Sequence, residues 1–286
     1  MDDGKLRALL TAVDCGSFSK AAAQLGYTQS AMTHLVNKLE AEIGCTLLER
    51  DSQGIRLTDA GRQLLPYIQN VVCACDTLLQ EAAEQSDPRK RTLRIGCFAS
   101  IARARLPELL RVFRAEHPEI QLDVLVRSEE LTTALASGRI QLALVDEARA
   151  KGFDFQPLAD APLVAVVPPD FPWEEDTIPL ERLLREPFLS SPDQYIEPFL
   201  PADAPRVEVS ASDDGAILSM VAAGLGVAVL SSFSLVGYEE RVRVLQLEQP
   251  IALRLGAAVK SINAAGTSAR TFLSFLCAYY GQEERL

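Results

Sequence analysis

A run of amide and hydroxyl side chains near residue 30 has the chemistry needed to read the edges of DNA base pairs. Projected as a helix at about 100° per residue, residues 28–43 divide into two faces. The polar face holds Gln29, Ser30, Thr33, His34 and Asn37, and the apolar face holds Met32, Leu35, Val36, Leu39 and Ile43. Amides and hydroxyls donate and accept at base edges, whereas Lys and Arg mainly hold phosphates. A solvated polar face is the simpler alternative for an isolated helix, so the neighbouring elements decide.

The elements that would position this face are three short helices. Apolar residues at three- and four-residue spacing over 6–13 predict a first helix, which Gly16 ends. A second helix is predicted over 18–25 with Ser17 as its N-cap, and a third from its N-cap Thr28 to about residue 43. Two helices joined by a tight turn containing glycine are typical of a helix-turn-helix.

A small hairpin is predicted directly after the third helix. Two short extended runs lie on either side of a turn at 51–54, with Arg50 on one arm and Arg56 on the other. A hairpin beside a helix-turn-helix is a wing, placed to touch the DNA backbone or the minor groove. Arg56 could clamp a phosphate or be merely solvated, and the sequence leaves both open.

The net charge of −11 excludes a protein that coats nucleic acid over its whole surface. Residues 1–58 carry a net charge of −1, and the remainder carries −10. Affinity for phosphates would therefore come from the local placement of four basic residues, which are Lys20, Lys38, Arg50 and Arg56.

A long helix is predicted over 59–83. Its apolar residues step by alternating three and four positions, as in a coiled coil, and they are Leu65, Ile68, Val72, Cys75, Leu79 and Ala82. Nothing in the first 58 residues is large enough to cover so long a stripe, so a partner helix from a second copy is expected. The polar segment 85–90 serves as a linker.

From residue 93 the pattern alternates between strands and helices, which predicts an α/β fold with a parallel sheet. Strands are expected at 93–98, 120–126, 140–145, 164–167, 188–190, 207–210, 227–230 and 253–260. Helices are expected at 129–137 and 213–223, another with Pro107 in its first turn, and a last helix, 268–280, that could return to either half. Two lobes with a crossover form a cleft, and small ligands bind at the carboxyl ends of strands in such sheets.

The sequence shows none of the signals typical of membrane proteins, metal-binding proteins or secreted proteins. The start of the chain is not a signal peptide. Residues 215–238 carry no charge, yet Gly224 and Gly226 interrupt them, so a buried helix, a turn and a buried strand are expected instead of a membrane span. The six cysteines lack metal-ligand spacing and are expected to be buried or half-buried free thiols in the cytoplasm.

Enzymatic chemistry is also poorly supported. The only histidines are His34, on the polar helix face, and His117, which precedes a proline, so a Ser-His-Asp set is not expected. The run 224–226 follows a helix and lacks a third glycine, which makes it a poor dinucleotide loop. Cys97 and Cys277 are the only cysteines of the α/β part, and a redox switch would want two in one mobile segment. We expect no catalytic residue, no cofactor and no metal.

The first 65 residues carry a dense set of motifs: Gly16-Ser17-Phe18-Ser19-Lys20-Ala21-Ala22, Leu25, Thr28-Gln29-Ser30-Ala31-Met32-Thr33, Leu39-Glu40, Gly44, Leu47-Leu48-Glu49-Arg50 and Leu57-Thr58-Asp59-Ala60-Gly61. This set resembles the LysR-type transcriptional regulators. Looser matches follow at 93–96, 117–118 and 221–227. The resemblance implies a winged helix-turn-helix, a dimerising linker helix, and an effector domain similar to periplasmic binding proteins. It also implies tetramers and control by a small-molecule inducer.

The resemblance assigns roles in DNA binding to several residues. Gln29 would be the main base reader, Ser30 and Thr33 would contact bases or phosphates, and Thr28 is foremost an N-cap that can also touch DNA. Lys20, Lys38 and Arg50 would hold the backbone, with Arg56 in the wing. His34 stands where the family has a basic residue, which weakens or removes a phosphate contact. Leu48 replaces the Phe that is usual in the family. Ser231 stands where the family typically has a proline, after the strand that follows the Gly-Leu-Gly run at 224–226.

In the effector domain, Ser100 and Ser128 resemble family positions that hold an inducer with hydroxyl and backbone N–H groups. Capping of a helix is the alternative role for each. Helix starts favour anions, so an anionic inducer is one expectation. Ser190 and Ser191 could line the opposite wall, and Asp213 and Asp214 are interpreted as complements of a helix dipole.

We therefore expect a cytoplasmic, ligand-responsive regulator that binds a dyad-symmetric operator in double-stranded DNA as a homodimer or homotetramer, and that would contact RNA polymerase if it activates. Its expected parts are a DNA-binding domain at 1–58, a linker helix and hinge at 59–88, one effector lobe at 89–162 and 262–286, and a second at 163–261. The alternative is a small-molecule-binding or catalytic α/β protein with a helical head for assembly.

Overall fold

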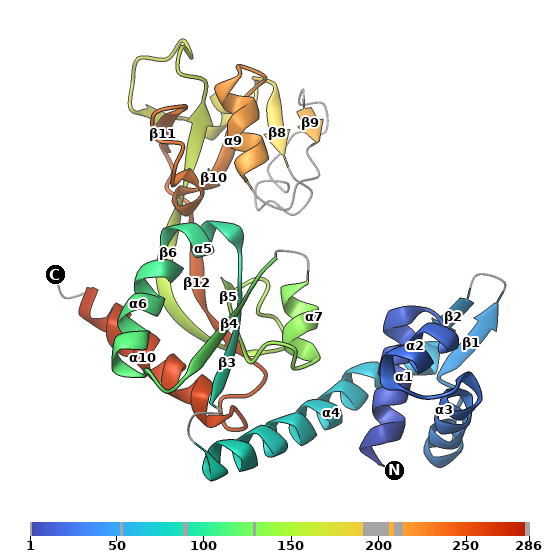
Figure 1. Ribbon diagram of the computed structural model, residues 1–286. Helices are drawn as coiled ribbons and strands as arrows, with labels where there is room; N and C mark the ends of the chain where they lie inside the picture. Colours follow the sequence, from blue (N-terminus) through green and yellow to red (C-terminus); the bar gives the residue numbers. More distant parts are fainter. Residues whose placement is uncertain are drawn as a thin grey trace. The chain divides into compact units, whose positions relative to one another are not determined.

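The computed structural model of the chain describes residues 2–51, 54–87, 91–127, 130–190, 206–208 and 214–283 (Figure 1). The side chains of Arg50, Asp51, Ser190, Arg206, Glu208, Gln282 and Glu283 also lie outside the described part. Two compact units are present. The first unit comprises residues 1–88 with 136–139, and the second unit comprises 89–135 with 140–286.

The first unit follows the order predicted from the sequence. Its elements are α1 (Asp3–Cys15), α2 (Phe18–Leu25), α3 (Gln29–Ile43), β1 (Leu48–Asp51), β2 (Gly54–Leu57) and α4 (Asp59–Ser86). Gly16, Gly26 and Gly44 end the first three helices with φ between 60° and 87°, a region that favours glycine. The predicted cap at Ser17 is half right. Ser17 occupies the N-cap position of α2, but its side chain makes no capping hydrogen bond.

The core of the first unit forms where the predicted apolar faces meet. Met32, Val36 and Leu39 of α3 are buried against residues of α1 and α2, while Leu35 and Ile43 pack at the margin. Gly61 shows how tightly α4 joins this core, because a Cβ at that position would lie 2.2 Å from the carbonyl oxygen of Leu47. Burial of one face of α3 leaves its other face to solvent.

The expectation that nothing in the first 58 residues covers the apolar stripe of α4 is wrong for its first half. Ile68 and Val72 are only 6% and 5% exposed, because they pack into the same core as Leu6 and Leu9. Farther along the helix the stripe is open, and Leu79 is 65% exposed in the chain by itself. The apolar stripe of α4 is thus part of the core at one end and exposed at Leu79 near the other.

The second unit is built on an eight-stranded mixed sheet. Its strand order is β4-β3-β5-β12-β6-β11-β7, with β10 paired to β6. The strands are β3 (Thr92–Cys97), β4 (Gln121–Val126), β5 (Leu142–Asp146), β6 (Asp154–Val167), β7 (Thr177–Ile178), β10 (Ala228–Ser231), β11 (Arg243–Leu247) and β12 (Ala252–Val259). The parallel sheet predicted from the strand–helix alternation is present as β4-β3-β5, and β12 then runs antiparallel to β5.

Helices connect and cover the parallel strands, which confirms the α/β expectation. They are α5 (Ala99–Ala104), α6 (Leu106–Glu116) and α7 (Leu131–Ala136). Pro107 lies in the first turn of α6, as predicted. The last helix, α10 (Thr267–Glu283), packs on this part of the unit. Phe272 and Phe275 contact Phe113 of α6 with ring centroids 4.8 and 5.3 Å apart.

β6 is much longer than the strand predicted at 164–167. It begins at Asp154, ten residues before the predicted start at residue 164, and passes through Pro157 and Pro162. Residues 154–162 pair only with β12, so this half of β6 has one free edge. Proline is tolerated at such an edge because no neighbouring strand needs the backbone N–H that proline lacks. The other half, 163–167, pairs with both β10 and β11. The strand therefore crosses from one half of the sheet to the other.

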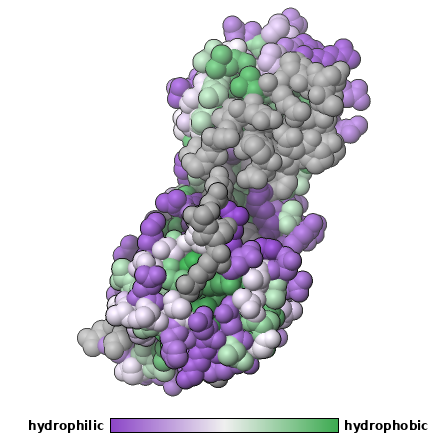
Figure 2. Space-filling view, turned by 90° about the vertical axis from the view of Figure 1, so that its right-hand side faces the viewer, coloured by the Kyte–Doolittle hydropathy of each residue, from purple (hydrophilic) through white to green (hydrophobic). Residues whose placement is uncertain are grey.

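The second half of the sheet carries the remaining elements. A separate pair, β8 (Phe188–Ser190) and β9 (Arg206–Glu208), runs parallel, and α8 (Leu180–Leu183), α9 (Gly215–Ala222) and the 3₁₀ helix η3 (Ser232–Leu235) complete it. Four elements of this half, β7, β11, α8 and η3, were not predicted from the sequence. Within the parts of the chain that are described, no helix is long and apolar enough to cross a membrane. Apolar side chains do reach solvent, and green hydrophobic surface lies among purple hydrophilic residues on the face in Figure 2.

Candidate nucleic-acid interface and effector site

The polar face predicted for the third helix is exposed on α3. Gln29, Ser30, His34 and Lys38 are all exposed, and Thr33 is half-buried. Thr28 is the N-cap of α3, and its Oγ1 accepts the backbone N–H of Ala31 at 3.2 Å. The helix therefore begins at an open surface, with its first turn presenting side chains outward and its backbone held by a side-chain cap.

Hydrogen bonds among neighbours orient the first polar side chains of α3. The hydroxyl of Ser19 on α2 donates to Oε1 of Gln29 at 3.0 Å. The hydroxyls of Thr28 and Ser30 lie 3.0 Å apart and share a hydrogen bond. Ser19 belongs to the motif at 16–22, but no role was predicted for it. Its position next to Lys20, at the exposed start of the helix that packs on α3, is the signal that could have drawn attention to it.

The basic residues assigned to phosphates lie on both the helix-turn-helix and the wing. Lys20 of α2 and Lys38 of α3 are exposed. In the hairpin, Arg56 of β2 is exposed and pairs across the strands with Glu49, while Arg50 of β1 pairs with Ile55. The turn at 52–53 lies outside the described residues. Hence three of the four predicted cations have described side chains, and each of these faces solvent.

A carboxylate that the sequence analysis missed ties the wing to the recognition helix. Oε1 of Glu40, near the end of α3, accepts the backbone N–H groups of Leu47 and Leu48 at 2.6 and 3.0 Å. These N–H groups stand at the start of β1, so one side chain sets the distance between α3 and the hairpin. An acidic residue one turn before a helix-ending glycine and a strand was the available signal.

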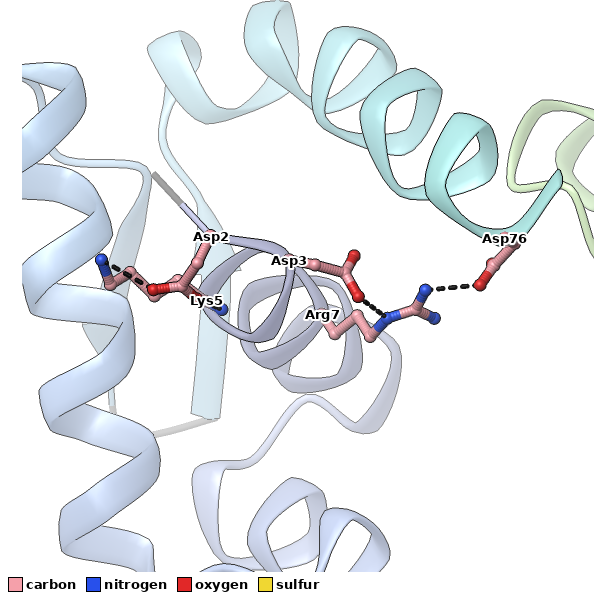
Figure 3. A network of polar contacts seen from close by, with 5 residues as sticks. All are labelled: Asp2, Asp3, Lys5, Arg7 and Asp76. Carbon is pink, nitrogen blue, oxygen red and sulfur yellow. Dashed lines mark hydrogen bonds and ion pairs between the residues drawn. The ribbon is translucent and has the colours of Figure 1, made fainter. Parts of the chain in front are cut away.

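Ion pairs join α1 to its neighbours on either side. Nζ of Lys5, a largely buried side chain, lies 2.6 Å from Oε1 of Glu42 on α3 and 3.0 Å from Oδ2 of Asp2, and these partners raise the pKa of Lys5. Arg7 contacts Asp3 within α1 and Asp76 of α4, and both carboxylates raise the pKa of Arg7 (Figure 3). The recognition helix and the linker helix are therefore both fastened to α1 by charge.

The residues predicted to bind an effector lie in the second unit, and one of them is described with its side chain. Ser100 is the second residue of α5, directly after β3, and is half-buried. The N-cap of α5 is Phe98, without a side-chain hydrogen bond, so Ser100 is not the cap. Ser128 and Ser191 lie outside the described residues. Ser190 ends β8, where its backbone pairs with Glu208, and its side chain is outside the described part.

A cation lies at the carboxyl edge of the parallel strands. Arg149 donates at 2.9 Å to Oδ2 of Asp146, the buried last residue of β5, and its guanidinium lies 5.2 Å from the ring centroid of Phe98, the residue after β3. Such stacking of a guanidinium on an aromatic ring holds the side chain in one orientation. The carboxyl ends of β3 and β5 are thus linked by the cation of Arg149, and Phe98, against which it lies, is two residues before Ser100 in the chain.

The two halves of the second unit also touch through η3. Phe233 of η3 packs against the core that surrounds β3 and α6, and Arg105 lies 4.9 Å from its ring centroid. Oγ of Ser231, the N-cap of η3, accepts the N–H of Phe233 at 3.3 Å. Asp214 lies at the N-cap of α9, not in its first turn, and its carboxylate accepts from the buried hydroxyl of Ser234. Asp213 lies outside the described residues.

The cysteines of the second unit differ in accessibility. Cys97 is buried at the end of β3, and burial raises the pKa of its thiol to about 12. Cys277 on α10 is exposed, contrary to the expectation of six buried or half-buried thiols, and desolvation still raises its pKa. Thiolates are the reactive form, so neither environment activates its sulfur. Among the described residues, no cluster of three or more His, Cys, Asp or Glu could hold a metal ion.

Two family models cover nearly the whole chain. "Bacterial regulatory helix-turn-helix protein, lysR family" matches residues 4–62, and "LysR substrate binding domain" matches residues 86–280. The transcriptional regulator YvbU of Bacillus subtilis is 27% identical over 293 residues, covering 98% of this chain and 99% of that protein. A probable hydrogen peroxide-inducible genes activator of Mycobacterium leprae is 32% identical over 187 residues, covering 64% of this chain and 60% of that protein.

Solved structures agree in fold. A full-length variant of OxyR from Pseudomonas aeruginosa superposes with a TM-score of 0.69 at 23% identity, covering 97% of this chain and 94% of that one. At this identity the likeness concerns the fold, which is a winged helix-turn-helix with a linker helix and a two-lobed α/β domain.

Proposed function

The chain belongs to the LysR family of bacterial transcriptional regulators, and from this premise we propose which of its residues read DNA and which hold the effector. As a member of the family it is a DNA-binding regulator with an effector-binding domain. The alternative, a small-molecule-binding or catalytic α/β protein with a helical head for assembly, is not favoured. We further propose that it has no catalytic activity of its own and acts where the DNA is, in the cytoplasm.

Gln29 is the main base reader of this proposal, with Ser30 and Thr33 beside it. The observation that carries the assignment is the first turn of α3, where exposed amide and hydroxyl groups stand at the N-terminal end of a capped helix. In helix-turn-helix proteins, residues at the start of the second helix reach base edges in the major groove. Lys20, Lys38 and Arg50 would hold the DNA backbone, with Arg56 in the wing. Thr28 caps the helix and can also touch DNA, and His34 would make a weaker phosphate contact than the basic residue usual in the family.

The test is selection of genomic fragments by the purified protein, followed by titration of the recovered site against salt. We expect a dyad-symmetric site that Gln29→Ala binds without selectivity while its mass in solution is unchanged. Gln63→Ala, at an exposed position of α4, removes the same kind of side chain away from α3 and should retain selectivity. Selectivity that survives Gln29→Ala would contradict the assignment.

For the second unit we propose a small-molecule effector, with an anion as the first candidate, bound near Ser100, Ser128 and Ser190. Ser100 supports this because it stands after β3, half-buried and without a capping role. Arg149, stacked on Phe98, adds positive charge at the same edge of the sheet. In thermal melts of the protein with a panel of organic mono- and dicarboxylates, we expect one compound to raise the melting temperature.

Ser100→Ala should weaken that stabilisation, whereas Ser274→Ala, at an exposed position of α10, should leave it as it is. Although one relative is named for induction by hydrogen peroxide, the buried thiol of Cys97 argues for a different signal here. Peroxide that changes operator binding through Cys97 or Cys277 would contradict the small-molecule assignment.

Assembly through the linker helix completes the proposal, with the chain as a homodimer or homotetramer that contacts RNA polymerase if it activates. Leu78 and Leu79 of α4 are 69% and 65% exposed in the isolated chain, and a second copy of the helix would cover them. Leu79→Lys should lower the mass measured by light scattering. An unchanged mass would contradict assembly through this part of the helix.

A further inference from the structure

We propose that Ser19 fixes the amide of Gln29 so that Gln29 reads bases by donation and prefers guanine or thymine to adenine or cytosine. The inference rests on the proposed role of Gln29 as base reader. It adds a positioning residue from the other helix of the helix-turn-helix, and it names the chemical class of base that the site takes.

The contact that carries the inference joins two helices at an open surface. Ser19 is the second residue of α2, Gln29 is the first residue of α3, and both are exposed. The hydroxyl of Ser19 donates to Oε1 of Gln29 at 3.0 Å. Because α2 and α3 are packed together through buried residues such as Phe18 and Met32, the two side chains meet at a fixed separation.

The hydrogen bond decides which end of the amide is available to DNA. A glutamine amide has one oxygen with two accepting lone pairs and one NH₂ that donates twice, so a bond to the oxygen mainly sets the direction in which each end points. Ser19 draws Oε1 toward α2, and Nε2 of Gln29 has no hydrogen-bond partner within the described parts of the chain. Gln29 therefore presents donors outward.

The neighbouring hydroxyls add to the same polarity. Thr28 Oγ1 accepts the N–H of Ala31 and shares a hydrogen bond with Ser30 Oγ, 3.0 Å away, in which either hydroxyl can be the donor. When Thr28 donates, the hydrogen of Ser30 is free to donate to DNA. The positive end of the dipole of α3 lies at this turn as well, so the whole surface favours acceptors.

A donor surface discriminates between bases in the major groove. Guanine O6 and thymine O4 accept there, whereas adenine N6 and cytosine N4 donate from the equivalent position. The usual bidentate pair of glutamine with adenine needs the amide oxygen and the NH₂ together. With Oε1 held by Ser19, that pair is disfavoured, and donation to a keto oxygen is left.

The experiment uses the full-length protein and its selected operator. Every base pair of the half-site is replaced in turn, and the dissociation constant is measured at one salt concentration for the wild type and for Gln29→Ala. The position at which Gln29→Ala loses preference is the one that Gln29 reads. In the wild type we expect guanine or thymine to bind there more tightly than adenine or cytosine by on the order of tenfold.

The Ser19 variants then test the positioning role. Ser19→Ala should still bind the operator but reduce that ratio by several fold, with adenine gaining most, because the freed amide can rotate and form the bidentate pair. Ser19→Thr keeps the hydroxyl and should keep the ratio. Ser17→Ala, two residues earlier and without a capping hydrogen bond, is the matched control and should also keep it.

The outcomes separate this inference from the function on which it rests. If Gln29→Ala changes preference at no position, the base-reading role of Gln29 is wrong. Two other outcomes overturn only the inference about Ser19. In the first, Gln29→Ala changes preference at one position, but the wild type favours adenine or cytosine there. In the second, Ser19→Ala leaves the ratio at that position unaltered. Circular dichroism of each variant reports whether α2 and α3 have kept their helices.

Discussion

The two units of the chain place their candidate site residues in different ways. In the first unit, Gln29, Ser30 and Thr33 lie within five residues of one helix, and their exposure follows from helical periodicity and one N-cap. In the second unit, Ser100 lies on α5 and Ser190 ends β8, and the positions of these two elements depend on the pairing of distant strands. A site on one helix can be derived from a short window of sequence, whereas a site at strand ends depends on the whole sheet.

Their polar groups are also held differently. The DNA-facing side chains are exposed and oriented by single hydrogen bonds, such as the one from Ser19 to Gln29. In the second unit, Asp146 is buried and bound to Arg149, whose guanidinium stacks on Phe98. In the first unit, single hydrogen bonds thus orient polar side chains at an open surface, whereas in the second unit an ion pair and a ring contact hold Arg149.

The largest expected effect tests whether the two units are independent. Leu39→Ala removes a fully buried side chain of α3, which should destabilise the first unit by about 2–5 kcal/mol and abolish operator binding. The only tryptophan, Trp173, lies in the second unit, so its fluorescence transition in urea should not move. Leu245→Ala, the matched deletion beside Trp173 in the second core, should shift it. A shift of the Trp173 transition by Leu39→Ala would show that the units unfold together.

The sequence predicted the first unit well because local signals suffice there. The glycines at 16, 26 and 44 and the cap at Thr28 fixed helix ends that the structure confirms. The cover of Ile68 and Val72 escaped prediction, because it comes from the tertiary packing of α4 on its own domain. The role of Ser19 escaped as well, because periodicity within one helix carries no information about contacts with the next.

The second unit was predicted in outline and missed in detail. Strand–helix alternation predicted the parallel strands β3, β4 and β5, but the strand predicted at 164–167 omits the first half of β6, which contains Pro157 and Pro162. Those prolines are tolerated because residues 154–162 have β12 as their only strand partner, a fact of topology with no trace in the local sequence. The capping alternative for Ser100 could not be judged before the start of α5 was known, since the helix begins one residue earlier.

A second test concerns the link between α3 and the wing. Glu40→Ala leaves the N–H groups of Leu47 and Leu48 without their carboxylate, so we expect a loss of about 1–3 kcal/mol in the first unit. Operator affinity should fall as well, because the wing would no longer be held at its distance from α3. Glu40→Gln keeps an accepting oxygen and should recover most of both quantities in urea melts and binding titrations. Equal losses in the two variants would argue against this hydrogen-bond role.

A third test uses pH on the second unit. Burial raises the pKa of the Cys97 thiol to about 12 in the folded chain, above its ordinary value of 9.0. Between these values the unfolded chain binds fewer protons at this site than the folded chain, so stability falls as pH rises, by up to about 1.4 kcal/mol per pH unit. Below pH 9 the contribution is complete and flat. Urea melts by Trp173 fluorescence at pH 9–10.5 should show a steeper decline for the wild type than for Cys97→Ala.

The smallest effect is expected where the two halves of the second unit touch. Ser231→Ala removes the acceptor for the N–H of Phe233, and this cap should be worth about 0.5 kcal/mol because the bond is long, at 3.3 Å. Phe233→Ala deletes the ring that packs on the core around β3 and beneath Arg105, and its cost should be several times larger. If η3 only fills space, both variants would lower stability and leave the response to the effector unchanged. If η3 couples the two halves, Ser231→Ala should shift the effector concentration needed for half-maximal response. That shift should be larger than the small loss of stability implies. Thermal melts and operator-binding titrations of the same variants would measure both quantities.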